Sequence, residues 1–153
     1  MGFLDKLKSA ASAVTGGAAK VSIEYQPQVA MAGDSIRVKI TCTSTGGEVK
    51  SKGVFVDLRG LEVVNIGEHQ AGNDSLVHAS KTTFEQEIQI APALVLPPNE
   101  TKFFEGTVQL PATAQPSFHG TYAEHKWEIR GRLEAFGNDP DSGYQPLRVG
   151  IKS

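Results

Sequence analysis

The chain has 153 residues, a length that suits one domain with a sizeable core. Its net charge is −2 with acidic and basic residues interspersed, so the composition offers no basic face for nucleic acid. Cys42 is the only cysteine, which excludes a disulfide within the chain and suits a reducing compartment, so we expect a cytoplasmic protein. No apolar run approaches the roughly 20 residues of a membrane span.

Residues 2–14 are predicted to form a short amphipathic helix, because apolar residues recur there at helical spacing. The sequence TGGAA at 15–19 then ends the helix with two glycines, so we expect residues 1–19 to be a helix and its linker. The helix is expected to dock onto the domain or onto a partner protein. The residues expected to make that contact are Phe3, Leu4 and Leu7.

From Lys20 onward the hydrophobic pattern changes to a period of two, which predicts β-strands. The alternating segments lie at 21–25, 36–42, 54–58, 61–66, 82–90, 104–110, 118–135 and 147–151, with glycine- and proline-containing turns between them. Each segment has one apolar and one polar face and no helical segments intervene, so the sheets should be antiparallel. We predict an all-β fold, an immunoglobulin-like antiparallel β-sandwich, as a single domain over residues 20–153.

The stretch 118–135 alternates most regularly and is interpreted as one long structural strand with a bend at Gly120. Its apolar side chains, which should hold the two sheets together, are Trp127, Ile129 and Leu133. In an extended strand His119 and His125 would lie about 20 Å apart, too far to share a metal ion. We expect His125 at the edge of the sandwich.

His69 and His78 are the strongest metal-ligand candidates in the sequence. They lie symmetrically about the centre of HQAGNDSLVH, and a hairpin there would bring their Cβ atoms to about 5 Å. With Glu68 or Asp74 they would supply ligands for a divalent ion. Two ligands rarely make a site, so two solvated histidines in a loop are the favoured interpretation, and no metal or cofactor is expected.

The sequence contains no recognisable catalytic arrangement. No serine lies in a G-x-S-x-G elbow, no glycine-rich loop opens a helix, and no two acids form a recognisable acid–base pair. Cys42 has the apolar parity of its strand, where a buried thiol is inert. The aspartates of GNDPDSG at 137–143 lack the other ligands of a calcium loop and fit a turn. We therefore expect that the protein is not an enzyme.

Three stretches together resemble arrestin-type domains. Residues 25–62 resemble the opening of such domains, with a Gly-Asp turn before a strand, a hairpin and a second strand that ends in Leu-x-Gly. Residues 102–134 are similar to the strand, Leu-Pro, Pro-Ser-Phe-x-Gly and long strand that follow in the family, and 146–153 resemble its closing basic strand. The beginning of the chain, 1–21, resembles the bacterial sporulation-control branch, whose members start with a short helix.

The resemblance implies an immunoglobulin-like sandwich that serves as an adaptor or scaffold, without catalytic residues or a cofactor. A full arrestin has two such domains, so one domain is either sufficient alone or pairs with a second copy. We predict a non-enzymatic cytoplasmic protein-interaction module with a regulatory role in bacteria. Its exposed edge strands would accept a segment of a partner protein by β-augmentation.

Two alternatives stay open at this point. The first is a metal-binding protein that uses His69 and His78. The second is a peripheral membrane protein held by the N-terminal helix, although its apolar area is small for stable membrane binding.

Overall fold

The computed structural model describes residues 19–66, 77–135, 137 and 139–151, which form ten β-strands. The described part of the chain contains no helix, as the all-β prediction requires, and the helix predicted at 2–14 lies outside it. The strands are β1 (Ala19–Gln26), β2 (Val29–Met31), β3 (Ser35–Ser44), β4 (Val49–Ile66), β5 (Val77–Ala91), β6 (Leu94–Leu96), β7 (Thr101–Gln109), β8 (Phe118–His119), β9 (Ala123–Ala135) and β10 (Gln145–Gly150).

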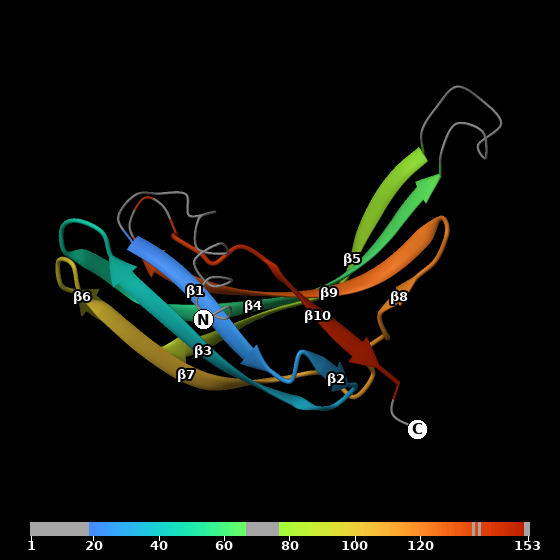
Figure 1. The fold of residues 1–153 in the computed structure, drawn as a ribbon, viewed down its shortest axis with the longest axis horizontal. Helices are drawn as coiled ribbons and strands as arrows, with labels where there is room; N and C mark the ends of the chain where they lie inside the picture. The colour runs from blue at the N-terminus through green and yellow to red at the C-terminus, as the bar shows by residue number, and fades with distance from the viewer. Residues whose placement is uncertain (1–18, 67–76, 136, 138, 152–153) are drawn as a thin grey trace, which may run out of the picture.

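The strands form two sheets that pack as an open sandwich (Figure 1). The smaller sheet has three strands in the order β1-β3-β7. The larger sheet has seven, in the order β2-β10-β9-β4-β5, with β6 paired to β4 and β8 paired to β9. At Gly131 of β9 the larger sheet contacts the smaller one closely, since an added Cβ would lie 3.2 Å from Ile40 and 3.4 Å from Ile23.

The alternating pattern of the sequence explains the core. In β3 the side chains of one parity are buried and those of the other face outward, as expected for a strand with one face on the core. The predicted anchors Trp127, Ile129 and Leu133 of β9 are at most 1% exposed, so their predicted role in the core is confirmed. The buried core residues of the smaller sheet are Ala19, Val21, Ile23, Ile36, Val38, Ile40, Cys42 and Val108.

Three details of the strand prediction were wrong. The segments 54–58 and 61–66 belong to one strand, β4, because Gly60 continues the pairing with Trp127 of β9 without a break. The sheets are not wholly antiparallel, because the short β2 pairs with β10 in parallel. The chain also folds back at Gly120, whose amide donates to the carbonyl of Ala123 at 2.8 Å, so 118–135 is not one strand.

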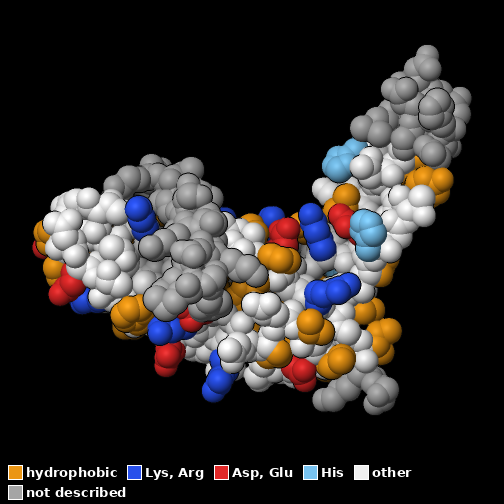
Figure 2. Space-filling model, in the orientation of Figure 1, with side chains coloured by type: hydrophobic (Ala, Val, Ile, Leu, Met, Phe, Trp, Pro, Cys, Tyr) orange, Lys and Arg blue, Asp and Glu red, His pale blue; other side chains and the backbone are white. Residues whose placement is uncertain are grey.

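β4 and β5 run beyond the smaller sheet and form an arm, which we define as residues 61–66 and 77–82 (Figure 1). Side chains 78–82 of the arm are all exposed. Figure 2 shows the arm projecting from the body of the molecule, and it shows acidic and basic side chains interspersed over this face. The described surface therefore has no single charged face in this view.

Candidate interaction surface

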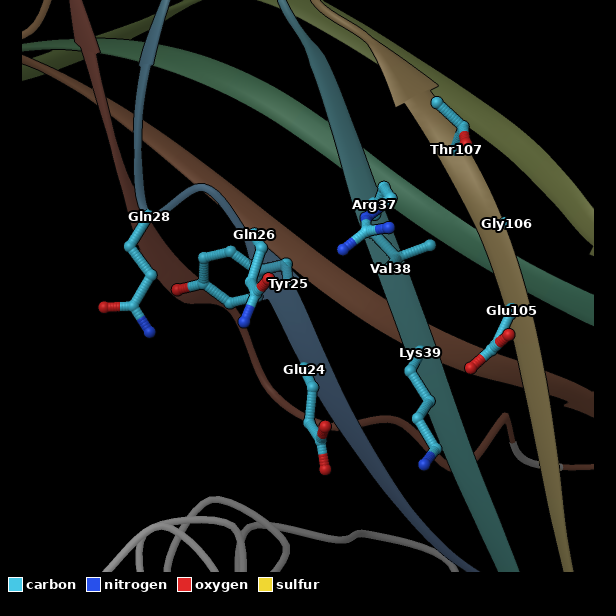
Figure 3. Close-up of a pocket in the computed structure, with 10 residues that line it drawn as sticks. All are labelled: Glu24, Tyr25, Gln26, Gln28, Arg37, Val38, Lys39, Glu105, Gly106 and Thr107. Carbon is cyan, nitrogen blue, oxygen red and sulfur yellow. The ribbon is translucent and has the colours of Figure 1, made fainter.

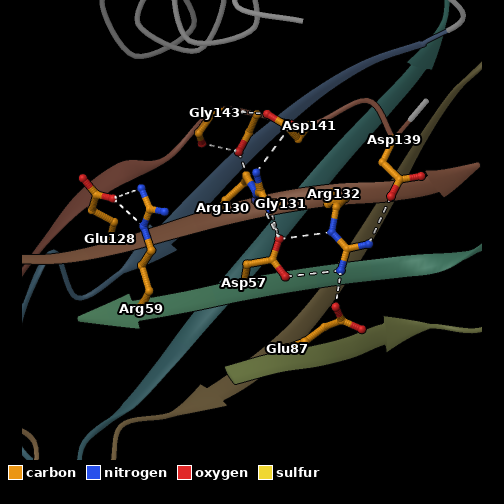
Figure 4. A network of polar contacts seen from close by, with 11 residues as sticks. Asp57, Arg59, Glu87, Glu128, Arg130, Gly131, Arg132, Asp139, Asp141 and Gly143 are labelled. Atoms are coloured by element: carbon orange, nitrogen blue, oxygen red, sulfur yellow. Dashed lines mark hydrogen bonds and ion pairs between the residues drawn. The ribbon is translucent and has the colours of Figure 1, made fainter. Parts of the chain in front are cut away.

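A ladder of ion pairs lies on the outer face of the larger sheet (Figure 4). Asp57 of β4 is at its centre and accepts hydrogen bonds from Nε and Nη2 of Arg130 at 2.9 and 2.7 Å. Arg132 donates to the two carboxylate oxygens of Asp57 at 3.1 and 3.2 Å. The Nη2 atom of Arg132 also donates to Glu87 of β5 at 2.6 Å. The ladder thus joins three neighbouring strands of the sheet.

The segment after β9 is attached to the same ladder. Asp139 lies 3.6 Å from Arg132, and Asp141 lies 3.7 Å from Arg130. The amide of the fully buried Ser142 donates to the carbonyl of Gly131 at 2.9 Å. The described residues of the segment predicted as a turn, 137–143, thus lie beside β9, and Asp139 and Asp141 pair with arginines of that strand.

The ladder is a structural feature. Burial by itself would lower the pKa of Arg132, but its hydrogen bond to Asp57 and the charges of Asp57, Glu87 and Asp139 raise the pKa above its ordinary value. A guanidinium that stays protonated transfers no proton near neutral pH. We therefore assign the ladder to stability.

A second group of contacts continues the ladder toward β10. Arg59 Nη2 lies 2.6 Å from Glu128 Oε2, and its guanidinium stacks 3.6 Å from the ring centroid of Tyr144. Arg130 lies 4.5 Å from the same centroid. Burial raises the pKa of Tyr144, although the two arginines act in the opposite direction. The tyrosine therefore stays neutral at physiological pH.

His125 is buried, which corrects its predicted place at the sandwich edge. The chain reversal at Gly120 and the loop before β8 cover it, so only 1% of the residue is exposed. Its Nδ1 lies 3.1 Å from the carbonyl oxygen of Pro116, and its Nε2 lies 2.7 Å from Oγ1 of Thr83. The carbonyl oxygen of Pro116 can only accept, so Nδ1 is the donor in that contact, whereas the hydroxyl of Thr83 can donate to Nε2 or accept from it. His125 is thus a core residue with both nitrogens occupied.

The metal-site candidates are not brought together within the described residues. His78 is exposed on the arm opposite Asn65, and its predicted partner His69 lies outside the described residues. His119 contacts only Glu124, at 3.1 Å, and its side chain is 84% exposed. Over residues 19–66, 77–135, 137 and 139–151, no three His, Cys, Asp or Glu residues form a group that would hold a metal ion.

The predicted contact residues Phe3, Leu4 and Leu7 also lie outside the described residues. Among the residues that the structure does describe, no helix is long and apolar enough to cross a membrane.

A groove of about 690 Å³ lies on the smaller sheet, along β1, β3 and β7 (Figure 3). Two cross-strand rows on the outer face of the sheet line it. The first row is Glu24, Lys39 and Glu105, in which a cation stands between two anions. The second row is Gln26, Arg37 and Thr107.

The charges of the groove are available to a ligand. Within the described residues, no hydrogen bond or ion pair engages the side chain of Arg37, Glu24 or Glu105. Lys39 contacts only the ring of Phe103, whose centroid lies 4.7 Å from Nζ. Phe103 is itself 60% exposed and lies next to the charged row on the same face. The groove therefore offers both signs of charge and an aromatic surface.

β1 borders this groove and provides a regular free edge in the described residues. It pairs only with β3, and the register continues from Ala19 to Gln26 without a bulge. β7 is the other edge strand of this sheet and also pairs with β3 without a bulge, and Ile90 of β5 contacts it at Gly106. The edges of the larger sheet are less regular, since two register shifts interrupt the pairing of β5 and β2 has three residues. A row of free backbone amides and carbonyls on an edge strand is a template for another strand.

Comparison with known proteins adds evidence from the fold. No family model matches the sequence, and no curated protein sequence matches it either. The solved structure of Spo0M, a sporulation control protein from Bacillus subtilis, matches 90% of this chain with a TM-score of 0.65 and 17% sequence identity. The two share an arrestin-like fold. The chain spans about half of that structure, 51% of its length. The resemblance inferred from the sequence is thus confirmed at the level of the fold.

Sequence reasoning did not find the groove or the ladder. Both consist of residues from three strands that are far apart in the chain, and alternation alone gives no cross-strand register. The one signal in the sequence was the alternation of charges on the polar faces, which is equally typical of a solvated strand.

Proposed function

We propose that the protein is a non-enzymatic interaction module, an immunoglobulin-like sandwich of arrestin type that acts as an adaptor or scaffold. An extended segment of a partner protein would lie along β1, extend the smaller sheet by one strand and place side chains in the groove. The observation that carries the proposal is the free, regular edge of β1 beside a groove whose charges have no partner in the described residues.

Backbone hydrogen bonds to β1 would supply affinity without regard to sequence, and the groove would supply specificity. A partner side chain of either charge would find a counterpart, an acidic one at Arg37 or Lys39 and a basic one at Glu24 or Glu105. These charges are solvent-accessible, so they would affect the association rate and the choice of partner more than the total affinity.

A cytoplasmic and regulatory role in a bacterium belongs to the same proposal. Its support is the fold shared with a sporulation control protein. The metal-binding and membrane alternatives depend on His69 and on residues 2–14, which lie outside the described residues.

Site-specific photocrosslinking in cells tests the proposal. A photoreactive residue replaces Ser22 or Gln26 of β1 in one set of proteins, and Thr82 on the arm in the control. We expect the two β1 positions to crosslink to one short segment of one partner, and the arm position to leave that segment unlabelled. Crosslinks from the arm alone, or turnover of a substrate by the purified protein, would contradict the proposal.

The partner segment is then tested as a peptide. Lys39→Glu should change its association rate by roughly tenfold, a decrease for an acidic segment and an increase for a basic one. Glu85→Lys is the matched control, since Glu85 is exposed on β5 of the other sheet. Equal changes in the two variants would place binding outside the groove.

A further inference from the structure

The outer face of the smaller sheet consists of cross-strand rows, and β1 supplies the first residue of each row. The even-numbered residues of β1 lie on this face, because Val21 and Ile23 between them are buried. A strand added to β1 would extend the same rows, with its Cβ atoms about 5 Å from those of β1. The residues of β1 that such a strand would face on the outer side are Lys20, Ser22, Glu24 and Gln26.

Three of these four rows carry one uncompensated charge. In the row of Glu24, the single cation Lys39 stands between two anions, which leaves one negative charge (Figure 3). The row of Gln26 has the guanidinium of Arg37 as its only charge. The row of Lys20 continues with two threonines, so its only charge is that lysine. The rows are therefore positive, neutral, negative and positive in the order Lys20, Ser22, Glu24 and Gln26.

The uncompensated charges are available to an added strand. Among the described residues, no ion pair engages the side chain of Lys20, Glu24 or Arg37. Opposite charges that face each other across two strands stabilise the pairing, and like charges destabilise it. A strand whose side chains have the opposite sign in each charged row is therefore favoured on the β1 edge.

We propose that the partner segment of β1 is a strand with an acidic side chain opposite Lys20, a basic one opposite Glu24 and an acidic one opposite Gln26. This inference rests on the proposed function and names the chemistry of the segment that the β1 edge accepts. The pattern is asymmetric, so it also reports the direction of the added strand. The acid that lies two residues from the base follows the base in a parallel strand and precedes it in an antiparallel one.

The acid opposite Gln26 serves Arg37, which lies one strand further into the sheet. Two strand spacings, about 9.6 Å, separate the backbone of the added strand from that of β3. The side chain between them, Gln26, is uncharged and has an amide that can donate to the acid. The longer glutamate therefore suits this position better than aspartate.

Tyr25 determines the residue between the base and the glutamate. Its hydroxyl donates to the carbonyl of Pro146 in β10, which holds the partly buried ring beside the edge of the smaller sheet. The residue opposite Tyr25 in an added strand points to the inner face and contacts this ring. We therefore expect an apolar residue there, so the central part of the segment is basic, apolar and acidic.

Selection from a library of random nonapeptides displayed on phage tests the pattern. The full natural chain should enrich peptides with a basic residue two positions from a glutamate and, on its other side, four positions from a second acid. Glu24→Lys should replace the enriched basic residue by an acidic one. Glu85→Lys, on the exposed surface of the other sheet, should leave the pattern unchanged. Enrichment without these charges, or the same pattern with Glu24→Lys, would overturn the inference.

A synthetic peptide of the enriched sequence separates the charge pattern from the proposed function. Glu24→Lys should weaken its binding by roughly fivefold, and exchange of the basic residue of the peptide for glutamate should restore the binding. Glu24 is on the outer face, so equal urea midpoints of the natural chain and the variant verify that the core is intact. If the peptide crosslinks to a photoreactive residue at Ser22 and Glu24→Lys has no effect, the charge pattern is wrong and the proposed function stands. If no selected peptide crosslinks at Ser22, both fail.

Discussion

Arg132 is nearly buried, and its guanidinium connects Asp57, Glu87 and Asp139. We expect Arg132→Met to lower the free energy of unfolding by about 3 kcal/mol, because the substitution leaves the buried Asp57 with a weaker set of partners. Urea denaturation measures the difference.

Arg59→Met is the control for this prediction. Arg59 pairs with Glu128 but its side chain is 32% exposed, so its loss should cost less than about 1 kcal/mol. If Arg132→Met and Arg59→Met lowered the free energy of unfolding equally, Arg132 would contribute no more to stability than an exposed ion pair.

The thiol of Cys42 gives a prediction about pH. Burial raises its pKa from 9.0 to about 12, so folding favours the neutral thiol. The contribution of the neutral, buried thiol to the free energy of unfolding is therefore complete below pH 9.0, and it is lost as the pH rises toward about 12. Cys42→Val should therefore lose less stability than the natural protein over this range.

The measurement is the urea midpoint of both proteins as a function of pH. Burial also raises the pKa of Tyr25 and Tyr144, so both proteins should weaken above pH 10. Parallel curves for the two proteins would exclude a contribution from the thiol.

At the level of the element, the turn between β6 and β7 depends on one conformation. Asn99 has φ of 57°, and Glu100 closes the turn by donating to the carbonyl of Pro97 at 3.2 Å. Asn99→Val should lower stability by about 1–2 kcal/mol, because a β-branched residue is strained in the left-handed region. Asn99→Gly should be neutral or stabilising, and thermal unfolding compares the three proteins.

The elements also show how far the sequence predicts this structure. Alternation identified the strands of the core and the anchors Trp127, Ile129 and Leu133, because one buried face requires a period of two. It missed β2 and β6, which have three residues each and no periodicity of their own. It also merged β8 and β9 into one strand, and His125 was misplaced because its burial depends on the chain reversal between these two strands.

The function-related surfaces were less predictable than the core. The groove depends on the register that aligns Lys39 of β3 with Glu24 and Glu105, and register is a property of strand pairs rather than of single strands. The ladder depends on the same kind of pairing, between Asp57 and Arg130.

Across the whole molecule, the arm of the larger sheet should be locally less stable than the centre of β4 and β9. The centre of β4 and β9 is covered by the smaller sheet on one side and by the ladder on the other, whereas the arm has exposed side chains at 78–82. We expect amides of 61–66 and 77–82 to exchange hydrogen faster than those of 54–58 and 127–133. Equal protection in both parts would mean that the arm opens only with the whole domain.

The contact between Ile90 and Gly106 has a consequence for how the two sheets are held together. An added Cβ at Gly106 would lie 2.7 Å from the end of the Ile90 side chain, so a larger residue at 106 requires that side chain to move. Ile90 belongs to β5 of the larger sheet and Gly106 to β7 of the smaller one, so the contact joins the two sheets. We therefore expect a larger residue at 106 to change the spacing between the sheets along this side of the sandwich, while each sheet keeps its own pairing.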